Sequence, residues 1–315
     1  SISALIILCL LFFKKNKKIF SKIKSETYFF LIFYLIILIS LIFSSSVKTS
    51  FLPSFFYFRY FLFAVGVFYL LEKYSFFSNM IFYSLIVSFS LIATDSLIQL
   101  TFKQNILGYS LGFDGTIFIT SFFDQEKKLG SYLVRFLPMI LGLCFFFDLK
   151  KYSKYIVLIV GIFIFLSSER AALFLYMIIL FFYLCIIKNK IKIMTIYLLI
   201  FSLVFIINPK RSYKIIDYTL QQFGFIETYW NENYNDKIRY YSKEHEDLAL
   251  TAIVIFKNNY LNGNGVKTFH KACSLYKEDE KQKGINYLEF SNRNNKLACS
   301  THPHNTYLQI LSEIG

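Results

Sequence analysis

The sequence contains few charged residues, and this scarcity limits the classes of protein to which it can belong. Only 17% of its 315 residues are charged, whereas about a quarter of the residues are charged in ordinary soluble domains. Hydrophobic residues make up 56% of the chain and aromatic residues 20%. Because apolar runs of membrane-spanning length recur between short lysine-rich clusters, a soluble globular domain is excluded and a polytopic membrane protein is predicted.

Acidic residues are scarcer than basic ones, which leaves a formal net charge of +14. The basic residues punctuate apolar runs, as the positive-inside rule produces, so we expect membrane lipid and no nucleic acid as a partner. No charged region precedes the first apolar segment, residues 1–13, so we interpret it as a truncated spanning helix and not as a signal peptide. Since the chain opens at Ser1 within this segment and stops at Gly315 soon after a helical pattern begins, we expect a fragment.

Eight apolar runs reach spanning length once their flanking residues are included. They fall near residues 1–13, 28–43, 55–71, 80–98, 132–147, 155–168, 171–187 and 192–207. Lysine clusters at 14–24, 150–154 and 188–192 all fall on one side of the predicted membrane. By the positive-inside rule, that side is cytoplasmic.

The composition changes after residue 207, where Asn, Lys, Glu, Tyr and the only tryptophan, Trp230, replace the apolar runs. We therefore predict an all-α fold with a transmembrane bundle at 1–207 and a mainly helical subdomain at 208–304 on the outer side of the membrane. Residues 305–315 are expected to begin the next spanning helix. Within the subdomain, residues 245–260 have the apolar spacing of a helix.

The five cysteines divide by environment. Cys9, Cys144 and Cys185 lie in predicted spans, whereas Cys273 and Cys299 share the outer segment. We interpret the latter two as a disulfide pair, with two free thiols as the alternative that the sequence leaves open. In an oxidising periplasm a disulfide is permitted, and it would stabilise the subdomain by about 3 kcal/mol.

All six arginines fall on the predicted outer side, whereas the cytoplasmic clusters contain only lysine. They are Arg59, Arg135, Arg170, Arg211, Arg239 and Arg293. Three of them lie at the outer ends of spans, where a cation is costly unless an anion partners it. The planar donor fork of arginine matches phosphate oxygens, so we hypothesise that these residues bind a diphosphate. The alternative is a set of interfacial arginines that pair with Glu169, Asp95 or lipid phosphates.

Two apolar runs meet at residues 167–172 with only a few polar residues between them. The chain must therefore turn at membrane depth, where unpaired backbone groups are tolerated only beside a cavity. The alternative is a short hairpin turn closed by a Glu169–Arg170 ion pair.

Gly263 and Gly265 are interpreted as a helix stop followed by a turn.

His304 is the candidate general base. Thr306 and Gln309 fit a capping box, which predicts that a helix starts at this point. The partial positive charge of a helix N-terminus disfavours imidazolium, so a histidine just before it is kept neutral and able to accept a proton. Plain interfacial histidines are the simpler alternative.

His302 is expected to contribute less than His304. Pro303 restricts His302 to an extended conformation, which we expect to point its ring away from that of His304. A metal site formed by both histidines with His270 or a cysteine is a further alternative, although no second pair of ligands has metal-site spacing.

In this region the sequence resembles the O-antigen ligase and polymerase family of bacterial inner-membrane glycosyltransferases. Four motifs carry the resemblance, in order along the chain: Leu129-Gly130-Ser131-Tyr132-Leu133 with Pro138, Ser168-Glu169-Arg170-Ala171-Ala172, Gly263-Asn264-Gly265 with Phe269 and Cys273, and His302-Pro303-His304-Asn305 with Tyr307, Leu308, Leu311, Glu313 and Gly315. One stretch departs from the pattern, because residues 117–122 lack the Arg and Gly that the family often shows ahead of the first motif.

The resemblance implies transfer of a glycan from undecaprenyl diphosphate to an acceptor hydroxyl at the periplasmic face, without metal, cofactor or nucleotide sugar. The acceptor is lipid A core for a ligase and a growing glycan for a polymerase. His304 would deprotonate the acceptor, while Arg170 and Arg211 stabilise the charge that grows on the diphosphate. The further candidate substrate-binding residues are Arg59, Arg135, Glu169, His302 and Asn305.

Two other functions are weighed against this one. A transporter or lipid-linked glycan flippase calls for ionisable residues near the middle of spans and for helices interrupted by Gly or Pro in paired halves. Neither feature is evident in the sequence. A structural membrane protein with an outer adhesion domain leaves the arginines at the ends of the spans unexplained.

Overall fold

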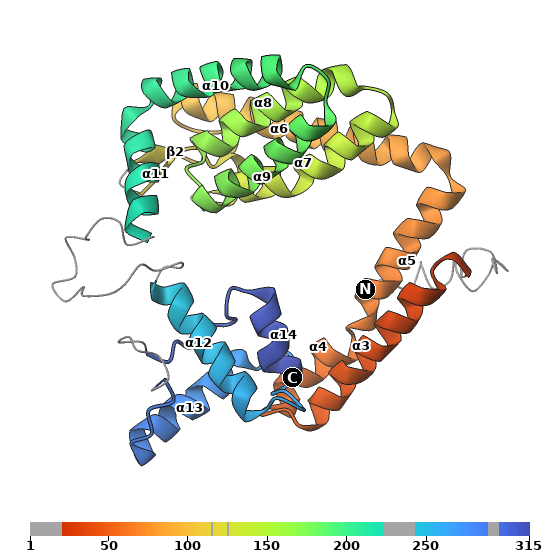
Figure 1. Cartoon of the computed structure of the whole chain (residues 1–315), viewed down its shortest axis with the longest axis vertical. Coiled ribbons are helices and arrows are strands. Elements are labelled where there is room, and N and C mark those ends of the chain that lie inside the picture. The colour runs from red at the N-terminus through yellow and green to blue at the C-terminus, as the bar shows by residue number, and fades with distance from the viewer. Residues whose placement is uncertain (1–20, 115, 125, 223–242, 289–295) are drawn as a thin grey trace. The chain divides into compact units, whose positions relative to one another are not determined.

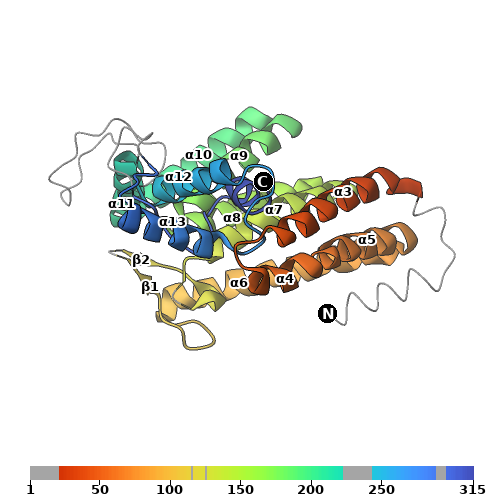
Figure 2. The same cartoon turned by 90° about the horizontal axis from the view of Figure 1, so that it is seen from below.

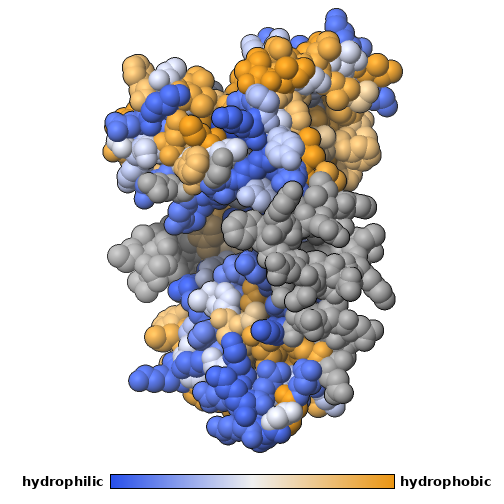
Figure 3. All heavy atoms as spheres, turned by 90° about the vertical axis from the view of Figure 1, so that its left-hand side faces the viewer, coloured by the Kyte–Doolittle hydropathy of each residue, from blue (hydrophilic) through white to orange (hydrophobic). Residues whose placement is uncertain are grey.

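The computed structural model describes residues 21–114, 116–124, 126–222, 243–288 and 296–315, and almost all of its regular structure is helical (Figure 1). Five described stretches are long and apolar enough to cross a membrane: residues 24–42, 47–73, 75–102, 129–146 and 190–207. Hydrophobic residues gather over much of the upper part of the view in Figure 3, as lipid contact requires. The predicted all-α, polytopic helical fold is confirmed.

The chain forms two compact units. The first comprises residues 1–73 and 222–315, and the second comprises residues 74–221. These units reflect helix packing, whereas the boundary predicted at residue 207 reflects a change from apolar to polar sequence. The domain division at 207 and 304 therefore stays a prediction, and its first span, 1–13, lies outside the described residues.

The second unit is a helical bundle in which the loop between its first two helices carries two short paired strands. Its elements are α6 (Ser75–Phe102), β1 (Gly112–Phe113), β2 (Ile117–Phe118), the 3-10 helix η1 (Ser121–Phe123), α7 (Leu129–Phe146), α8 (Lys150–Leu166), α9 (Arg170–Ile186), α10 (Lys190–Ile207) and α11 (Pro209–Gln222). Helix α7 is central, because it packs against α6, α8 and α9. Leu133, Leu137, Ile140 and Cys144, spaced by three or four residues, form its buried face.

The two lysine clusters of the second unit lie at the same end of its bundle. Lys154 near the start of α8 and Lys192 near the start of α10 line one cavity, and α8 contacts α10. The other end of α8 leads into the turn at Arg170. Helices α8 and α9 are 17 residues long, at the lower limit for crossing a bilayer.

The first unit joins N-terminal and C-terminal helices. Its elements are α3 (Lys24–Ile42), α4 (Val47–Phe55), α5 (Phe58–Lys73), α12 (Lys243–Asn258), α13 (Phe269–Lys283) and α14 (Thr306–Ile314). Helix α3 packs on α4 (Figure 2), while α14 contacts α3, α12 and α13. Helix α12 begins and ends two residues before the predicted helix at 245–260. Its apolar face buries Leu248, Ala252 and Ile255 against Phe269 of α13.

Cys273 and Cys299 form a disulfide with their Cα atoms 5.4 Å apart. Of the two states that the sequence left open, the structure has the bridged one. It links α13 to the segment that leads into His302. A hydrogen bond of 3.0 Å from the amide of Ala298 to the hydroxyl of Thr251 holds the same segment against α12.

Gly263 and Gly265 lie in the turn that follows α12, and both have positive φ angles, of 64° and 91°. A Cβ atom on Gly263 would lie 2.4 Å from the carbonyl oxygen of Glu313. The amide of Gly265 donates to that same oxygen over 2.8 Å. The two glycines form the predicted turn, and they also allow close packing against the end of α14.

Glu169 caps the start of α7. Its carboxylate accepts hydrogen bonds from the amide of Gly130 at 2.6 Å, the amide of Ser131 at 2.9 Å and the hydroxyl of Ser131 at 2.6 Å. A Cβ atom on Gly130 would lie 2.6 Å from the hydroxyl oxygen of Ser167. The alternative Glu169–Arg170 ion pair is absent from the described contacts, because the carboxylate is taken up by α7.

We expect Gly130→Ala to destabilise the second unit by about 1–3 kcal/mol, because the added methyl group overpacks the contact between α7 and the 167–170 turn. Gly142→Ala in the same helix is the matched control, since nothing lies within 4 Å of a Cβ atom there. Thermal unfolding of the purified proteins in detergent tests the difference. Equal melting temperatures for the two variants would contradict the proposed packing.

We expect Cys273→Ser to lower the free energy of unfolding by about 3 kcal/mol, because the bridge restricts the unfolded chain. Cys185→Ser, which removes an exposed free thiol, should have little effect. Thermal unfolding with and without reductant measures both. Reductant should destabilise wild type and leave the Cys273→Ser protein unchanged; no response of wild type to reductant would contradict a stabilising bridge.

Candidate functional site

A cationic cavity of about 210 Å³ lies in the second unit. It is lined by Asp114, Lys127, Ser168, Arg170, Arg211, Lys214, Ile215 and Tyr218. These residues come from the loop between α6 and α7, from the turn between α8 and α9, and from α11. Four cationic side chains face one carboxylate, so the cavity carries net positive charge and is suited to an anion.

Arg211 is the most buried cation of the cavity, with 8% of its surface exposed. One terminal nitrogen donates to the carbonyl of Ile117 at 2.7 Å, and the other donates to the side chain of Asn208 at 3.5 Å. Its Nε is buried and donates to no group among the described residues. Burial lowers the pKa of Arg211 below its ordinary value, but a guanidinium stays protonated near neutral pH.

Arg170 is exposed at the first position of α9. Its guanidinium donates to the carbonyl of Tyr218 at 2.6 Å and lies 5.5 Å from the centroid of the same tyrosine ring. Ser168, two residues earlier, has a positive φ of 58°. Its hydroxyl oxygen is buried and has no hydrogen-bond partner among the described residues. The turn predicted to lie beside a cavity does so.

Asp114 joins two lysines in the same cavity. Lys214 Nζ lies 2.8 Å from one carboxylate oxygen, and Lys127 contacts the other. Burial alone would raise the pKa of Asp114, but hydrogen bonds and attraction from the two lysines hold it below its ordinary value. None of these three residues was predicted from the sequence. The one available signal was the three-residue spacing of Arg211 and Lys214, which places two cations on one helix face.

Two buried side chains of α6 fix the loop that forms the cavity wall. Asp95 accepts the hydroxyl of Ser121 at 2.6 Å, and Gln99 accepts the amides of Thr120 and Ser121, both at 2.9 Å. Asp95 therefore serves the loop, and no arginine is seen paired with it among the described contacts. The stretch 117–122, which departs from the family pattern, contributes a backbone carbonyl to the site.

Arg59 and Arg135 are not brought into this cavity. Arg59, in the first unit, is exposed; it donates to the Tyr60 hydroxyl at 3.0 Å and lies 4.9 Å from that ring's centroid. Arg135 is exposed on α7. Arg239 and Arg293 lie outside the described residues.

A histidine cluster lies in the first unit. The ring centroids of His302 and His304 are 4.3 Å apart, and those of His245 and His304 are 5.7 Å apart. The expectation that Pro303 turns the two rings of the motif apart was wrong. His304 adopts a positive φ of 53°, and this left-handed turn brings its ring back to His302. His245 was not identified as a candidate from the sequence.

The helix after the histidines begins at Thr306, as predicted, but its cap differs. Asn305 is the N-cap, and its side-chain oxygen accepts the amides of Tyr307 at 3.0 Å and Leu308 at 3.2 Å. The expected capping box of Thr306 and Gln309 was therefore wrong by one residue. Asn305 can take this role because its short amide bonds directly to the first turn.

His304 is exposed just before this cap. Partial burial lowers its pKa, and the nearby rings of His302 and His245 lower it further, so its neutral form is favoured. Among the described residues, no group of three or more His, Cys, Asp or Glu side chains could hold a metal ion. A neutral imidazole can accept a proton.

Comparisons with known proteins place the chain in a family. The family model described as O-antigen ligase matches residues 155–315, just over half of the chain. The matched region includes Arg170, Arg211 and His304, whereas Asp114 and Lys127 precede it. Searches of curated proteins and of solved structures gave no match. The apolar helices make the chain a multi-pass membrane protein. It belongs to the O-antigen ligase family, which indicates a ligase-like function in O-antigen biosynthesis.

Proposed function

We propose that this protein transfers a glycan from undecaprenyl diphosphate to an acceptor hydroxyl at the periplasmic face of the bacterial inner membrane. The acceptor is lipid A core or a growing glycan, and the reaction uses neither nucleotide sugar nor metal. The observation that carries this proposal is the cationic cavity, where buried donors of Arg211 and Ser168 have no partner among the described residues. Buried donors without partners are costly, so they favour binding of an anion.

The diphosphate is the part of the donor that the cavity suits. Each phosphate of a diphosphate diester carries a negative charge, and arginine binds phosphate oxygens through paired N–H groups. Arg170 and Arg211 are both held by backbone carbonyls, which cancel no charge, and Asp114 offsets the charge of Arg170 only in part. Lys127 and Lys214 add charge that a single carboxylate, Asp114, only partly offsets.

His304 is proposed as the general base. It accepts the proton of the acceptor hydroxyl as that oxygen bonds to the anomeric carbon of the glycan, while the bond from this carbon to the diphosphate oxygen breaks. The electron pair stays on the departing diphosphate, whose negative charge Arg170 and Arg211 stabilise.

The other candidate residues have supporting parts in this proposal. Glu169 holds the turn that carries Arg170, and Asn305 caps the helix that follows His304. Arg59 and Arg135, both exposed, are proposed to contact phosphate groups of the carrier or of membrane lipid. The lysine-bearing end of the second unit is proposed to face the cytoplasm. The end with the cationic cavity around Arg170 and Arg211 is proposed to face the periplasm.

We expect Arg211→Lys to lower turnover by about 10²- to 10³-fold, because lysine keeps the charge but loses the fork that binds two phosphate oxygens. Arg170→Lys should have a similar effect. Lys210→Arg, at an exposed neighbouring position, is the control. A reconstituted transfer assay with purified carrier-linked glycan measures all three variants. Wild-type turnover by both Arg→Lys variants would remove these arginines from the diphosphate site.

We expect His304→Ala to lower turnover by about 10²- to 10⁴-fold while leaving affinity for the carrier near normal, because a general base acts on the chemical step. His302→Ala should cost less, since its ring contacts His304 and is not the proposed base. Equal losses in the two variants, together with inactivation of wild type by chelator, would favour a metal site instead.

We expect turnover to fall as the pH drops below the pKa of His304, which lies under the ordinary value of about 6.5. The sign follows from the base needing to be neutral. In His302→Ala, loss of one pKa-lowering neighbour should raise the pKa of His304 and move this fall to higher pH. A pH profile of turnover tests the shift, and a movement toward lower pH would contradict the role given to His302.

A further inference from the structure

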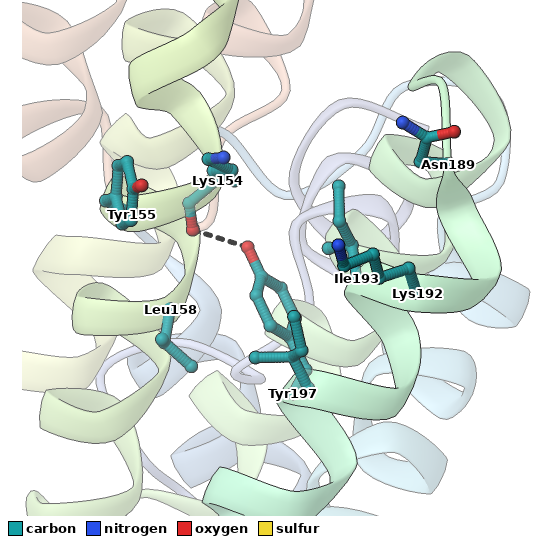
Figure 4. Close-up of a pocket in the computed structure, with 8 residues that line it drawn as sticks. Lys154, Tyr155, Leu158, Asn189, Lys192, Ile193 and Tyr197 are labelled. Atoms are coloured by element: carbon teal, nitrogen blue, oxygen red, sulfur yellow. Dashed lines mark hydrogen bonds between the residues drawn. The ribbon is translucent and has the colours of Figure 1, made fainter.

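A second cavity, of about 270 Å³, lies between α8 and α10 at the lysine-bearing end of the second unit (Figure 4). Lys154 and Tyr155 line it from α8, and Asn189 and Lys192 line it from the start of α10. It lies at the opposite end of α8 from the turn that carries Arg170. It is therefore separate from the proposed diphosphate site, and nothing in the proposed transfer reaction uses it.

The lining changes from polar to aliphatic along both helices. Leu158 lies four residues after Lys154 on α8, and Ile193 lies four residues after Asn189 on α10, so each helix places an aliphatic side chain one turn beyond a polar one. The buried ring of Tyr197 spans the two helices, because its hydroxyl donates to the carbonyl of Lys154 (Figure 4). This contact fixes the spacing of α8 and α10 and so the width of the cavity.

The charge of the lining is uncompensated. Two lysines and no carboxylate are found among the described residues that line the cavity. The ammonium of Lys154 lies 4.9 Å from the centroid of the Tyr155 ring, which neutralises no charge. The nearby carboxylate of Asp148 faces a different lysine, Lys150, at 3.6 Å. An anion entering the cavity would thus meet two cations that no lining acid has paired.

We infer that this cavity binds the phosphodiester headgroup of an anionic membrane lipid. Lys154 and Lys192 bind the phosphate, and an acyl chain lies on the aliphatic residues one turn deeper. A soluble phosphate would use the lysines but not the apolar wall. On α10, the exposed Leu199 and Leu203 lie three and seven residues after Ile196 of the lining, so they continue this wall and suit contact with acyl chains.

The test places a fluorescent reporter at the cavity. Trp230→Phe removes the only tryptophan of the sequence, and Tyr155→Trp adds one to the cavity lining. This parent protein is reconstituted into vesicles that contain brominated phosphatidylglycerol or brominated phosphatidylcholine, both of which quench tryptophan on contact. We expect the anionic lipid to quench at a lower mole fraction than the zwitterionic lipid.

Removing charge from selected lysines distinguishes lipid binding in the cavity from a general attraction of anionic lipid to the lysine-bearing surface. Lys154→Gln with Lys192→Gln should weaken the preference for phosphatidylglycerol by roughly tenfold or more, given the usual contribution of a lysine near an anionic surface. The matched control, Lys151→Gln with Lys188→Gln, removes the same charge from exposed lysines that do not line the cavity and should retain the preference.

Three outcomes would overturn the inference. The parent protein would be quenched equally by both lipids, or the control pair would lose as much preference as the cavity pair. Alternatively, glycerol 3-phosphate in solution would relieve quenching at millimolar concentration, which would indicate a soluble phosphate as the occupant. Because the measurement reads lipid binding and not glycan transfer, its result does not depend on the proposed function.

Discussion

The structure depends on satisfying the backbone amides at the start of two helices, α7 and α14, because an unpaired amide at a helix start is costly. In the second unit, Glu169 takes up the first amides of α7. In the first unit, Asn305 takes up the first amides of α14. Two of the three residues proposed for chemistry, Arg170 and His304, are direct chain neighbours of these caps. Each cap therefore fixes the backbone beside a functional side chain while leaving that side chain exposed.

The same constraint explains why the motifs contain glycine. An amide can reach a buried acceptor only where the chains approach closely, and a Cβ atom would prevent this at Gly130 and at Gly263. Consequently the motif at Gly130 packs against the motif at Glu169, and the motif at Gly263 packs against the segment that ends at Glu313. Within each unit, two motifs that are far apart in the sequence therefore pack against each other.

Local patterns in the sequence predicted what depends on neighbours along the chain. Apolar runs gave the helices, and helix α12 was placed to within two residues because its periodicity is local. What the sequence did not predict depends on distant partners or on rare backbone angles. Asp114 reaches Lys214 only because Asp95 folds the intervening loop onto α6. His304 turns toward its neighbour through a left-handed conformation that non-glycine residues seldom adopt.

The cavity distinguishes between cations that are neutralised and cations that are only oriented. Lys127 and Lys214 share the carboxylate of Asp114, which cancels part of their charge. Arg170 and Arg211 instead donate to backbone carbonyls, and a carbonyl fixes the direction of a guanidinium without removing its charge. Asp114 also attracts Arg170, but its ion pairs among the described contacts are with the two lysines. Positive charge that is held in place before a ligand arrives needs no reorganisation when negative charge develops beside it. The two arginines are thus better prepared than the lysines to stabilise a departing diphosphate, although all four side chains line the same cavity.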